Sequence, residues 1–191
     1  MGPITIRTQR LVMRGFTETD RSAFAAINAD PVVTEFLQGP RSAAMTDDFL
    51  RRIDECWTTN GWSLWCVEVV GGPACIGYVG LWPAAHVGPE MVEVGWRLAA
   101  DQWGHGYAAE AAREAVRFGF ESAGLDEIVS FTVPQNRQSW RVMEKIGLIR
   151  DPAGDFDHAE VDPEVHPDLV HHVMYRLRRE QWEARASAPQ H

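Results

Sequence analysis

The chain has 191 residues, 45% of them hydrophobic and 24% charged, which suits one globular domain with a substantial core. A formal net charge of −9 argues against nucleic-acid binding, which requires a basic face. No apolar run is long enough to span a bilayer, and the first residues lack the basic-then-apolar order of a signal peptide, so we expect a cytoplasmic protein without membrane partners.

The first half of the chain predicts a strand, two helices and a strand hairpin. Thr17 is a suitable N-cap for the first helix, and Asp30-Pro31 stops it. The second helix is expected to begin at Thr46, with apolar residues at helical spacing after it. The sequence Gly71-Gly72-Pro73 is typical of a hairpin turn. The expected ranges are 11–16, 17–28, 46–59, 62–70 and 74–82.

The second half predicts a strand at 91–98, a glycine-rich loop, a helix at 107–120, a strand at 128–133, a helix opened by Asn136 and a strand at 170–177. Small residues form one stripe of the helix at 107–120 and predict close packing on a sheet. Residues 155–168 form an acidic loop, which is either solvated or attracts a cationic acceptor. Tryptophans 57, 62, 65 and 82 either fill the core or line an acceptor pocket.

Three cysteines, Cys56, Cys66 and Cys75, show no metal-type spacing. We expect buried thiols, no metal and no catalytic cysteine.

The run from Gln102 to Ala108 has two glycines at the expected strand-to-helix turn. Glycines let the backbone bend so that several N–H groups point the same way, and the helix that follows adds its positive N-terminal end. Such a loop can hold a diphosphate, although two glycines alone would also suit a plain turn. The strand before, the Ala-rich helix after and a second segment about 30 residues further on favour the phosphate loop.

That second segment runs from Asn136 to Leu148. Together with the Glu-bearing strand and the loop it resembles the GNAT superfamily of acetyl-CoA-dependent N-acyltransferases. The segments Thr8–Arg14 and Trp103–Glu110 resemble the branch of ribosomal-protein N-terminal alanine/serine acetyltransferases. The resemblance covers roughly Ile6 to Trp182 and does not specify the acceptor.

The resemblance implies an α/β (α+β) fold. We expect a single mixed, mostly antiparallel sheet of about six or seven strands, a splayed central strand pair and about four flanking helices. One acyltransferase domain is expected over 1–182, with 183–191 as a disordered tail. The protein is expected to be a monomer or homodimer that uses acetyl-CoA as co-substrate and an amine as acceptor.

The resemblance also assigns cofactor contacts. The amides from Trp103 to Tyr107 would take the diphosphate, and the pantetheine arm would pair with the strand at 96–98. Asn136 would add a side-chain bond, although it also suits a helix cap, and Arg141 would reach the 3′-phosphate unless it is only a surface arginine. The predicted cofactor-binding residues are Trp96, Arg97, Leu98, Gln102, Trp103, Gly104, His105, Gly106, Tyr107, Asn136 and Arg141.

Glu93 is the candidate general base. It lies mid-strand on the same face as Gly95 and Arg97, by the period of two. A carboxylate on a largely buried sheet is costly unless it is paired, which makes it a functional candidate. The alternative is a Glu93–Arg97 ion pair that only supports the site.

Ser139 is the candidate proton donor to the leaving thiolate. Many family members use a tyrosine seven residues after the motif asparagine, but Met143 stands there in this chain. The resembled branch suggests Ser139 instead, and its alternative role is to support the helix N-terminus. Tyr107 and Tyr175 are further candidates.

The acceptor sets how much work the base must do. An α-amine with a pKa of roughly 8 costs about 1.4 kcal/mol to deprotonate at pH 7, against about 4.6 kcal/mol for lysine. The leading hypothesis is therefore acetyl transfer to a protein or peptide N-terminal α-amine. The alternatives are a small-molecule amine acetyltransferase of aminoglycoside or polyamine type, a longer acyl donor, and a non-catalytic acyl-CoA-binding regulatory module.

Overall fold

A nine-stranded open sheet forms the centre of the part of the chain that the computed structural model describes, residues 2–186. Its order is β1-β2-β3-β4-β5-β6-β9-β7, with β8 paired to β9, and every pairing is antiparallel except β5–β6. The strands are β1 (Ile6–Arg7), β2 (Leu11–Arg14), β3 (Leu64–Val69), β4 (Gly77–Pro83), β5 (Val92–Leu98), β6 (Glu127–Thr132), β7 (Ile149–Arg150), β8 (Phe156–Asp157) and β9 (His171–Arg178).

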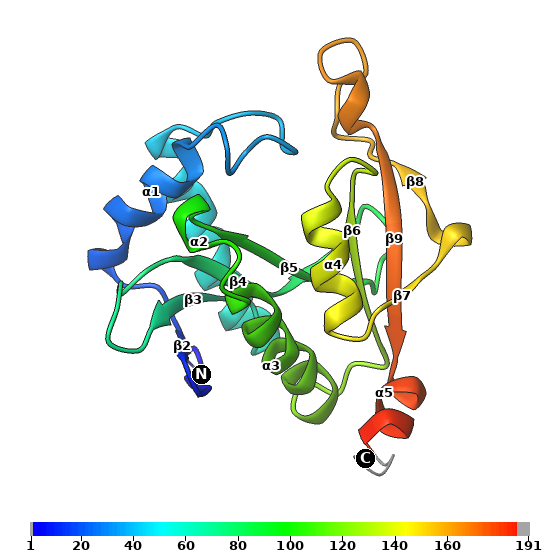
Figure 1. Cartoon of the computed structure of the whole chain (residues 1–191), viewed down its shortest axis with the longest axis horizontal. Coiled ribbons are helices and arrows are strands. Elements are labelled where there is room, and N and C mark those ends of the chain that lie inside the picture. Colours follow the sequence, from blue (N-terminus) through cyan, green and yellow to red (C-terminus); the bar gives the residue numbers. More distant parts are fainter. Residues whose placement is uncertain (1, 187–191) are drawn as a thin grey trace.

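Helices cover both faces of this sheet (Figure 1). Within the described chain they are α1 (Arg21–Ala29), α2 (Ala43–Asn60), α3 (Tyr107–Glu121), α4 (Arg137–Lys145) and α5 (Arg179–Ala186). Helix α3 packs on β4 and β5, and α4 packs against β6. Phe24 of α1 and Phe49 of α2 contact the ring of Tyr78 on β4, at 6.0 and 5.7 Å, so α1 and α2 cover the other face there.

The expected small-residue stripe does pack against the sheet. Ala111, Ala112 and Ala115 of α3 are fully buried. A β-carbon added at Gly119 would lie 2.7 Å from Ile128 Cδ1 on β6, so a larger side chain would push α3 off the sheet.

The predicted fold class is confirmed, with three differences in detail. Three two-residue strands, β1, β7 and β8, account for the higher strand count. Helix α2 begins at Ala43 rather than Thr46, because Ser42 Oγ accepts the Met45 N–H at 3.2 Å and so caps the helix earlier. The chain continues as α5 through 183–186, which were expected to be tail, and residues 187–191 of that expected tail lie outside the described residues.

None of the helices in the described residues combines the length and the apolar character needed to cross a membrane.

The parallel pair β5–β6 is the point where the sheet opens. Within the described chain these two strands are paired at a single position, where Glu93 lies opposite Val129, whereas β4 and β5 pair along seven residues. Beyond Glu93 the two strands therefore diverge toward their carboxyl ends, as the expected splayed pair requires.

Candidate active site

The glycine-rich loop presents unpaired N–H groups at the N-terminus of α3. Gly104 and Gly106 both have φ of 80°, and Gly106 is the N-cap residue without any side-chain cap bond. In the described structure no protein acceptor faces the amides of residues 104–109. Open amides at a helix N-terminus favour an anion, so this loop fits a diphosphate.

The loop is also open to an incoming group. A β-carbon added at Gly104 would meet no atom within 4 Å. Trp103 departs from the expected pattern, because its amide donates to the Ala100 carbonyl at 3.2 Å and its indole Nε1 donates to the Leu98 carbonyl at 2.9 Å. Trp103 thus attaches the loop to the end of β5. The N–H groups that remain available to a ligand belong to the residues after it.

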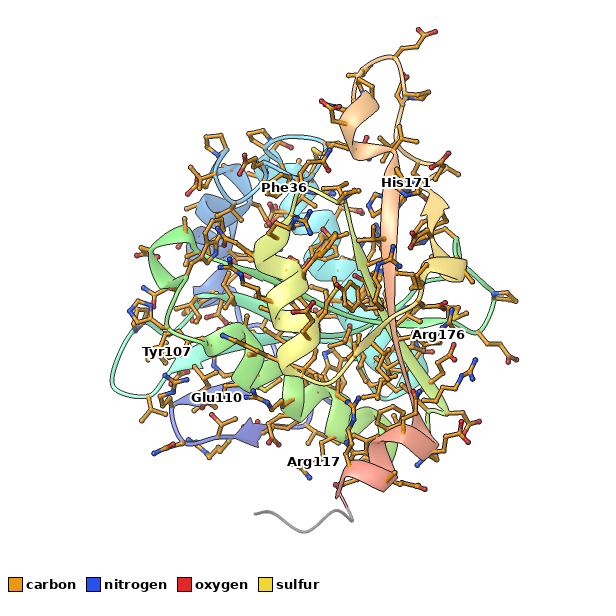
Figure 2. The ribbon with its side chains drawn as sticks, turned by 45° about the vertical axis from the view of Figure 1, so that its right-hand side comes forward. Phe36, Tyr107, Glu110, Arg117, His171 and Arg176 are labelled. Atoms are coloured by element: carbon orange, nitrogen blue, oxygen red, sulfur yellow. The ribbon has the colours of Figure 1, made fainter. Side chains whose placement is uncertain are left out.

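Arg10 holds this loop from the N-terminal strands. Its guanidinium donates to the His105 carbonyl at 2.9 Å and to Glu110 Oε2 at 2.7 Å, and it lies 5.0 Å from the Tyr107 ring. Thr8 Oγ1 donates to Glu110 Oε1 at 2.6 Å. Figure 2 shows Tyr107 and Glu110 at the start of α3. The sequence placed Thr8, Arg10 and Glu110 in two separate motifs and gave no sign that they meet.

The gap between β5 and β6 begins beside this loop. The amide of Ala99 donates to Ile76 at one end of the β4–β5 ladder, and the amide of Ala84 donates to Met91 at the other. Because antiparallel ladders alternate, the N–H and C=O of Trp96 turn away from β4 into the gap. An extended chain can add there as a strand. Of the three β5 residues predicted to pair with the pantetheine arm, Trp96 turns both its backbone N–H and its backbone C=O into the gap.

Glu93 lies at the narrow end of the gap. In the described chain its carboxyl has no hydrogen bond or ion pair, and it lies over Gly95, whose added β-carbon would be 3.3 Å from Oε1. Burial raises the pKa of Glu93 to about 8. The expected alternative, an ion pair with Arg97, is wrong, because Arg97 Nη1 donates to Asn28 Oδ1 at 2.6 Å.

Ser139 and Asn136 divide the capping of α4 between them. Asn136 Oδ1 accepts the Ser139 N–H at 3.2 Å, and Asn136 Nδ2 donates to Thr132 Oγ1 at 3.0 Å. Only the backbone of Ser139 supports the helix, and its half-buried hydroxyl makes no bond to the described residues. The hydroxyl is therefore available for other chemistry.

The other candidate acids are less suited. Met143 is 1% exposed and belongs to the core. The hydroxyl of Tyr175 donates to Glu144 Oε1 at 3.4 Å, and burial followed by the Glu144 charge raises the pKa of this tyrosine. Arg141 is exposed on α4 and makes no polar contact with the described residues, so its role in phosphate binding stays a prediction.

Two hollows lie on the surface beside α1 and α2 or the segment that joins them. One of about 500 Å³ lies between residues 16–21 and α2, and one of about 380 Å³ lies between residues 31–40 and 165–169. Gln38 Nε2 donates to the Glu160 carbonyl at 3.3 Å beside the second hollow. In the acidic loop, Asp155 bonds Arg150 and Asp157 bonds His171, so part of its charge is already compensated.

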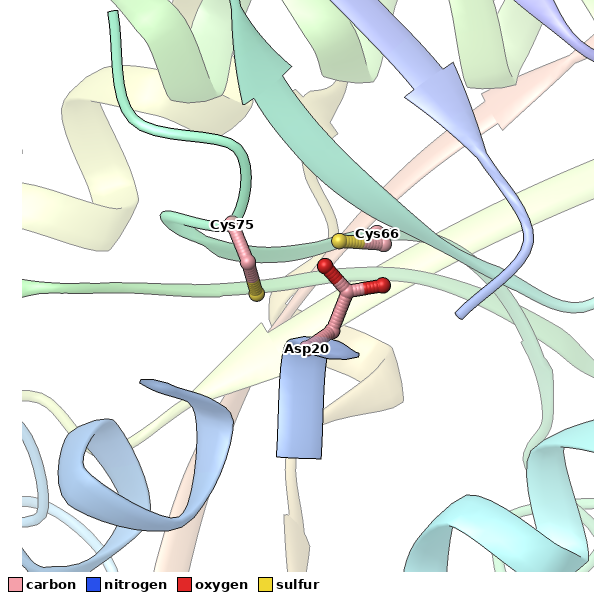
Figure 3. Close-up of side chains that lie close together, drawn as sticks. All are labelled: Asp20, Cys66 and Cys75. Carbon is pink, nitrogen blue, oxygen red and sulfur yellow. The ribbon is translucent and has the colours of Figure 1, made fainter. Parts of the chain in front are cut away.

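Asp20, Cys66 and Cys75 lie together, with potential ligand atoms within 4.8 Å of one another (Figure 3). The hairpin β3–β4 brings the two thiols together, which the sequence spacing did not indicate. Both carboxylate oxygens of Asp20 already accept from Arg14, at 2.7 and 2.9 Å, and Thr17 donates to one of them as well. The Asp20 carboxylate is therefore already neutralised by its ion pair with Arg14.

The chain matches the acetyltransferase (GNAT) domain family over residues 10–149. It is similar to the uncharacterized protein YkkB of Bacillus subtilis, at 29% identity over 74% of this chain and 83% of the relative. It is also similar to the FsC-acetyl coenzyme A-N(2)-transacetylase of Aspergillus fumigatus, at 29% identity over 93% of this chain and 77% of the relative.

Solved structures show the same architecture. An acetyltransferase from Agrobacterium tumefaciens superposes with a TM-score of 0.76 at 29% identity, covering 93% of this chain and 96% of that one. A ribosomal-protein-S5-alanine acetyltransferase from Vibrio fischeri superposes with a TM-score of 0.72 over 94% of this chain and 98% of that one. Its identity is 14%, so that likeness extends to the fold alone.

Proposed function

The chain belongs to the GNAT acetyltransferase family and is an acetyl-CoA-dependent acyltransferase, and on that premise we propose that its acceptor is an α-amine, as at the N-terminus of a protein or peptide. The observation that carries this proposal is the unpaired carboxyl of Glu93, whose pKa is raised to about 8 at the head of the β5–β6 gap.

The residues of the site fit acetyl-CoA. The open amides of residues 104–109 would hold the diphosphate, and the backbone of Trp96 would pair with the pantetheine arm. Bound there, acetyl-CoA supplies the thioester carbon that the amine attacks. An arm that follows β5 away from the loop would bring this carbon toward Glu93.

The pKa of Glu93 matches that of an α-amine. A base and an ammonium group that both titrate near pH 8 exchange a proton with little change in free energy, whereas taking a proton from lysine at roughly 10.4 costs about 3.3 kcal/mol. Glu93 would remove the proton from the acceptor, directly or through a water. This match favours an α-amine over a lysine side chain.

Ser139 would complete the proton movements. Its free hydroxyl lies in the first turn of α4, where it would donate a hydrogen bond to the sulfur as the thioester breaks. A thiol has a pKa of roughly 8.5, so a hydrogen-bond donor assists its departure without having to be a strong acid.

A small-molecule amine is the second candidate acceptor. It is considered because the similar Aspergillus fumigatus protein is named as an acetyl coenzyme A-N(2)-transacetylase, for one numbered nitrogen rather than for a protein N-terminus. A non-catalytic acyl-CoA-binding module would be indicated only by binding without thioester turnover.

The deciding experiment measures thiol release from acetyl-CoA at pH 8 with a panel of amines. The panel contains peptides with free Ala or Ser N-termini, the same peptides acetylated but carrying one lysine, aminoglycosides and polyamines. Release that depends on the free N-terminus supports the proposal. Release with the blocked lysine peptides at an equal rate, or no release despite acetyl-CoA binding, would contradict it.

A further inference from the structure

Three arginines on the face of β4 and β5 that α1 and α2 cover have no carboxylate partner among the described residues. Several arginines of this acidic protein, Arg10 and Arg14 among them, are ion-paired, whereas others such as Arg7 and Arg141 are exposed and form no ion pair with the described residues. In the described residues Arg41, Arg52 and Arg97, called here the arginine cluster, form no ion pair. An unpaired guanidinium is unremarkable alone on a surface, but three in one place are costly because like charges repel.

Aromatic side chains contact two members of the cluster, Arg97 and Arg52. The guanidinium of Arg97 lies 5.5 Å from the Tyr78 ring, and that of Arg52 lies 5.6 Å from the Trp82 ring. Phe49 joins these two rings, with centroids 5.7 Å from Tyr78 and 5.6 Å from Trp82. The result is an aromatic strip with a cation at each end.

Asn28 holds the third member beside the first. The backbone N–H of Arg41 donates to the Asn28 carbonyl at 2.8 Å, and Arg97 donates to the Asn28 side chain at 2.6 Å. Asn28 Nδ2 donates in turn to Thr46 Oγ1 at 3.1 Å, and Asn28 and Thr46 are 0% and 1% exposed. This buried network fixes the place from which Arg41 and Arg97 extend.

The charges in this region remain uncompensated. Burial lowers the pKa of Arg41, and the charges of Arg97 and Arg52 lower it further. The positive charge of Arg52 helps to lower the pKa of Asp48, but Asp48 is hydrogen-bonded at 2.6 Å to Arg51 and not to Arg52. An incoming anion would therefore find guanidinium groups without competitors.

The cluster shares a face of the sheet with Glu93, and its Arg97 end lies apart from the carboxyl. Trp82 is directly opposite Glu93 on the neighbouring strand, and Arg97 is four residues further along β5, about 13 Å by strand rise. Burial alone sets the pKa of Glu93, so the arginines do not neutralise the base. Helix α3 and its phosphate loop belong to the opposite face, so the cofactor phosphates have a separate place.

We propose that the amine acceptor carries an anionic group, a carboxylate or a phosphate, which the arginine cluster binds while the amine lies at Glu93. This inference rests on the proposed acetyl transfer. Of the two alternatives for the acidic loop, it favours the solvated loop over one that attracts a cationic acceptor. Polyamines and aminoglycosides are then poor acceptors, because they would bring further positive charge to three unpaired cations.

The test compares acceptors within two sets whose members differ in the charge of one group. One set is Ser-Glu, Ser-Gln and Ser-Lys peptides with amidated C-termini, and the other is phosphoethanolamine and ethanolamine. We expect kcat/KM to be about 10- to 100-fold higher for the anionic member of each set, the size of one charge-assisted bond. Equal rates within both sets, or a preference for the Lys peptide, would overturn the inference while leaving acetyl transfer intact.

Variants assign this preference to the cluster. Arg41→Gln and Arg52→Gln should each lower kcat/KM for the anionic acceptor, mainly through KM, by about tenfold more than for its neutral partner. Arg7→Gln, an exposed arginine of the edge strand β1, should change neither. A rise in the KM of acetyl-CoA in place of the acceptor KM would show that the arginines serve the cofactor and would contradict the inference.

A binding measurement covers the case in which no amine releases thiol. Calorimetry of phosphoethanolamine and the Ser-Glu peptide with the CoA complex needs no turnover. Binding that Arg41→Gln weakens would support the anion site even though the proposed reaction had failed. Undetectable binding of both, or binding that Arg41→Gln leaves unchanged, would overturn it.

Discussion

Glu93 is a carboxyl group that the fold leaves without a cation or a hydrogen-bond donor in the described structure. Its strand neighbour Arg97 bonds Asn28 instead, and burial alone raises the pKa of Glu93 to about 8. A neutral carboxyl at low pH that ionises near pH 8 suits proton transfer with an amine of similar pKa. The position in the strand was evident from the sequence, but the raised pKa depends on which way Arg97 turns.

Replacing Glu93 should remove one ionisation from the pH profile. With an acceptor amine of pKa well above 8, log kcat/KM of the Glu93→Gln variant should rise with a constant slope between pH 6 and 9. The parent profile should change slope near pH 8, where the carboxyl ionises. Steady-state rates at saturating acetyl-CoA provide the check. A parent profile with no break near pH 8 would exclude Glu93 as the base.

The same variant should alter how stability depends on pH. The folded pKa of Glu93 lies above its ordinary value of 4.5, so the stability from a neutral carboxyl is complete below that value and is lost as pH rises through 8. Glu93→Gln avoids this loss. Its free energy of unfolding relative to the parent should rise between pH 5 and pH 9 by up to about 4 kcal/mol, measured by denaturant titration.

Ser139 contributes its amide to the cap of α4, and its hydroxyl makes no hydrogen bond within the described structure. Ser139→Ala should therefore leave the melting temperature unchanged and slow thiol release about 10- to 100-fold, the loss of one hydrogen bond to developing charge. Asn136→Ala is the matched control, because it removes the cap itself and should cost about 1 kcal/mol of stability. Unchanged turnover in the serine variant would return Ser139 to a structural role.

Turns and helix ends were less predictable than the elements between them. The helix at 107–120 was predicted almost to its ends, because small and charged residues alternate there with helical period. Helix α2 begins before the predicted Thr46, since Thr46 is buried against Asn28 and Ser42 is the cap. That contact joins residues far apart in the chain, and no local pattern indicates it.

The glycine-rich loop should lose its ligand when a side chain is added. Gly104→Val places a branched side chain where the backbone is open to the diphosphate, and we expect acetyl-CoA binding to weaken at least about tenfold by calorimetry. Gly71→Val is the control, because Gly71 has a similar φ of 73° and equally open surroundings in the β3–β4 turn. Both variants should lose similar stability, but only the first should lose affinity. Equal affinities of the Gly104→Val variant and the parent for acetyl-CoA would refute the assignment of the diphosphate to the glycine-rich loop.

At the scale of the whole molecule, the sheet is two parts that meet at β5–β6. Strand alternation and the family resemblance were enough to predict an open mixed sheet with a splayed pair. The arginine cluster was not predictable, because it brings together a loop, a helix and a strand through Asn28 and the aromatic strip. Long-range contacts of this kind depend on how α1 and α2 lie on the sheet, which residue spacing does not encode.

Coenzyme A should stabilise the fold by occupying that opening. A ligand that binds only the folded state adds about 2.7 kcal/mol at 100 times its dissociation constant, which is roughly 5 to 10 °C in melting temperature for a chain of this size. A thermal melt at increasing coenzyme A provides the measurement, and Gly104→Val should require higher concentrations for the same rise. A melting temperature independent of coenzyme A would contradict the assigned site.

The free N–H of Trp96 makes a single backbone position a reporter of whether the pantetheine arm occupies the gap. An amide without an acceptor exchanges its proton with solvent faster than its neighbours in the β4–β5 ladder. Hydrogen exchange followed by NMR should therefore show rapid exchange at Trp96 in the free protein and slow exchange once the pantetheine arm pairs there. The amide of Arg97, which is already paired with β4, should be protected in both states and supplies an internal reference one residue away.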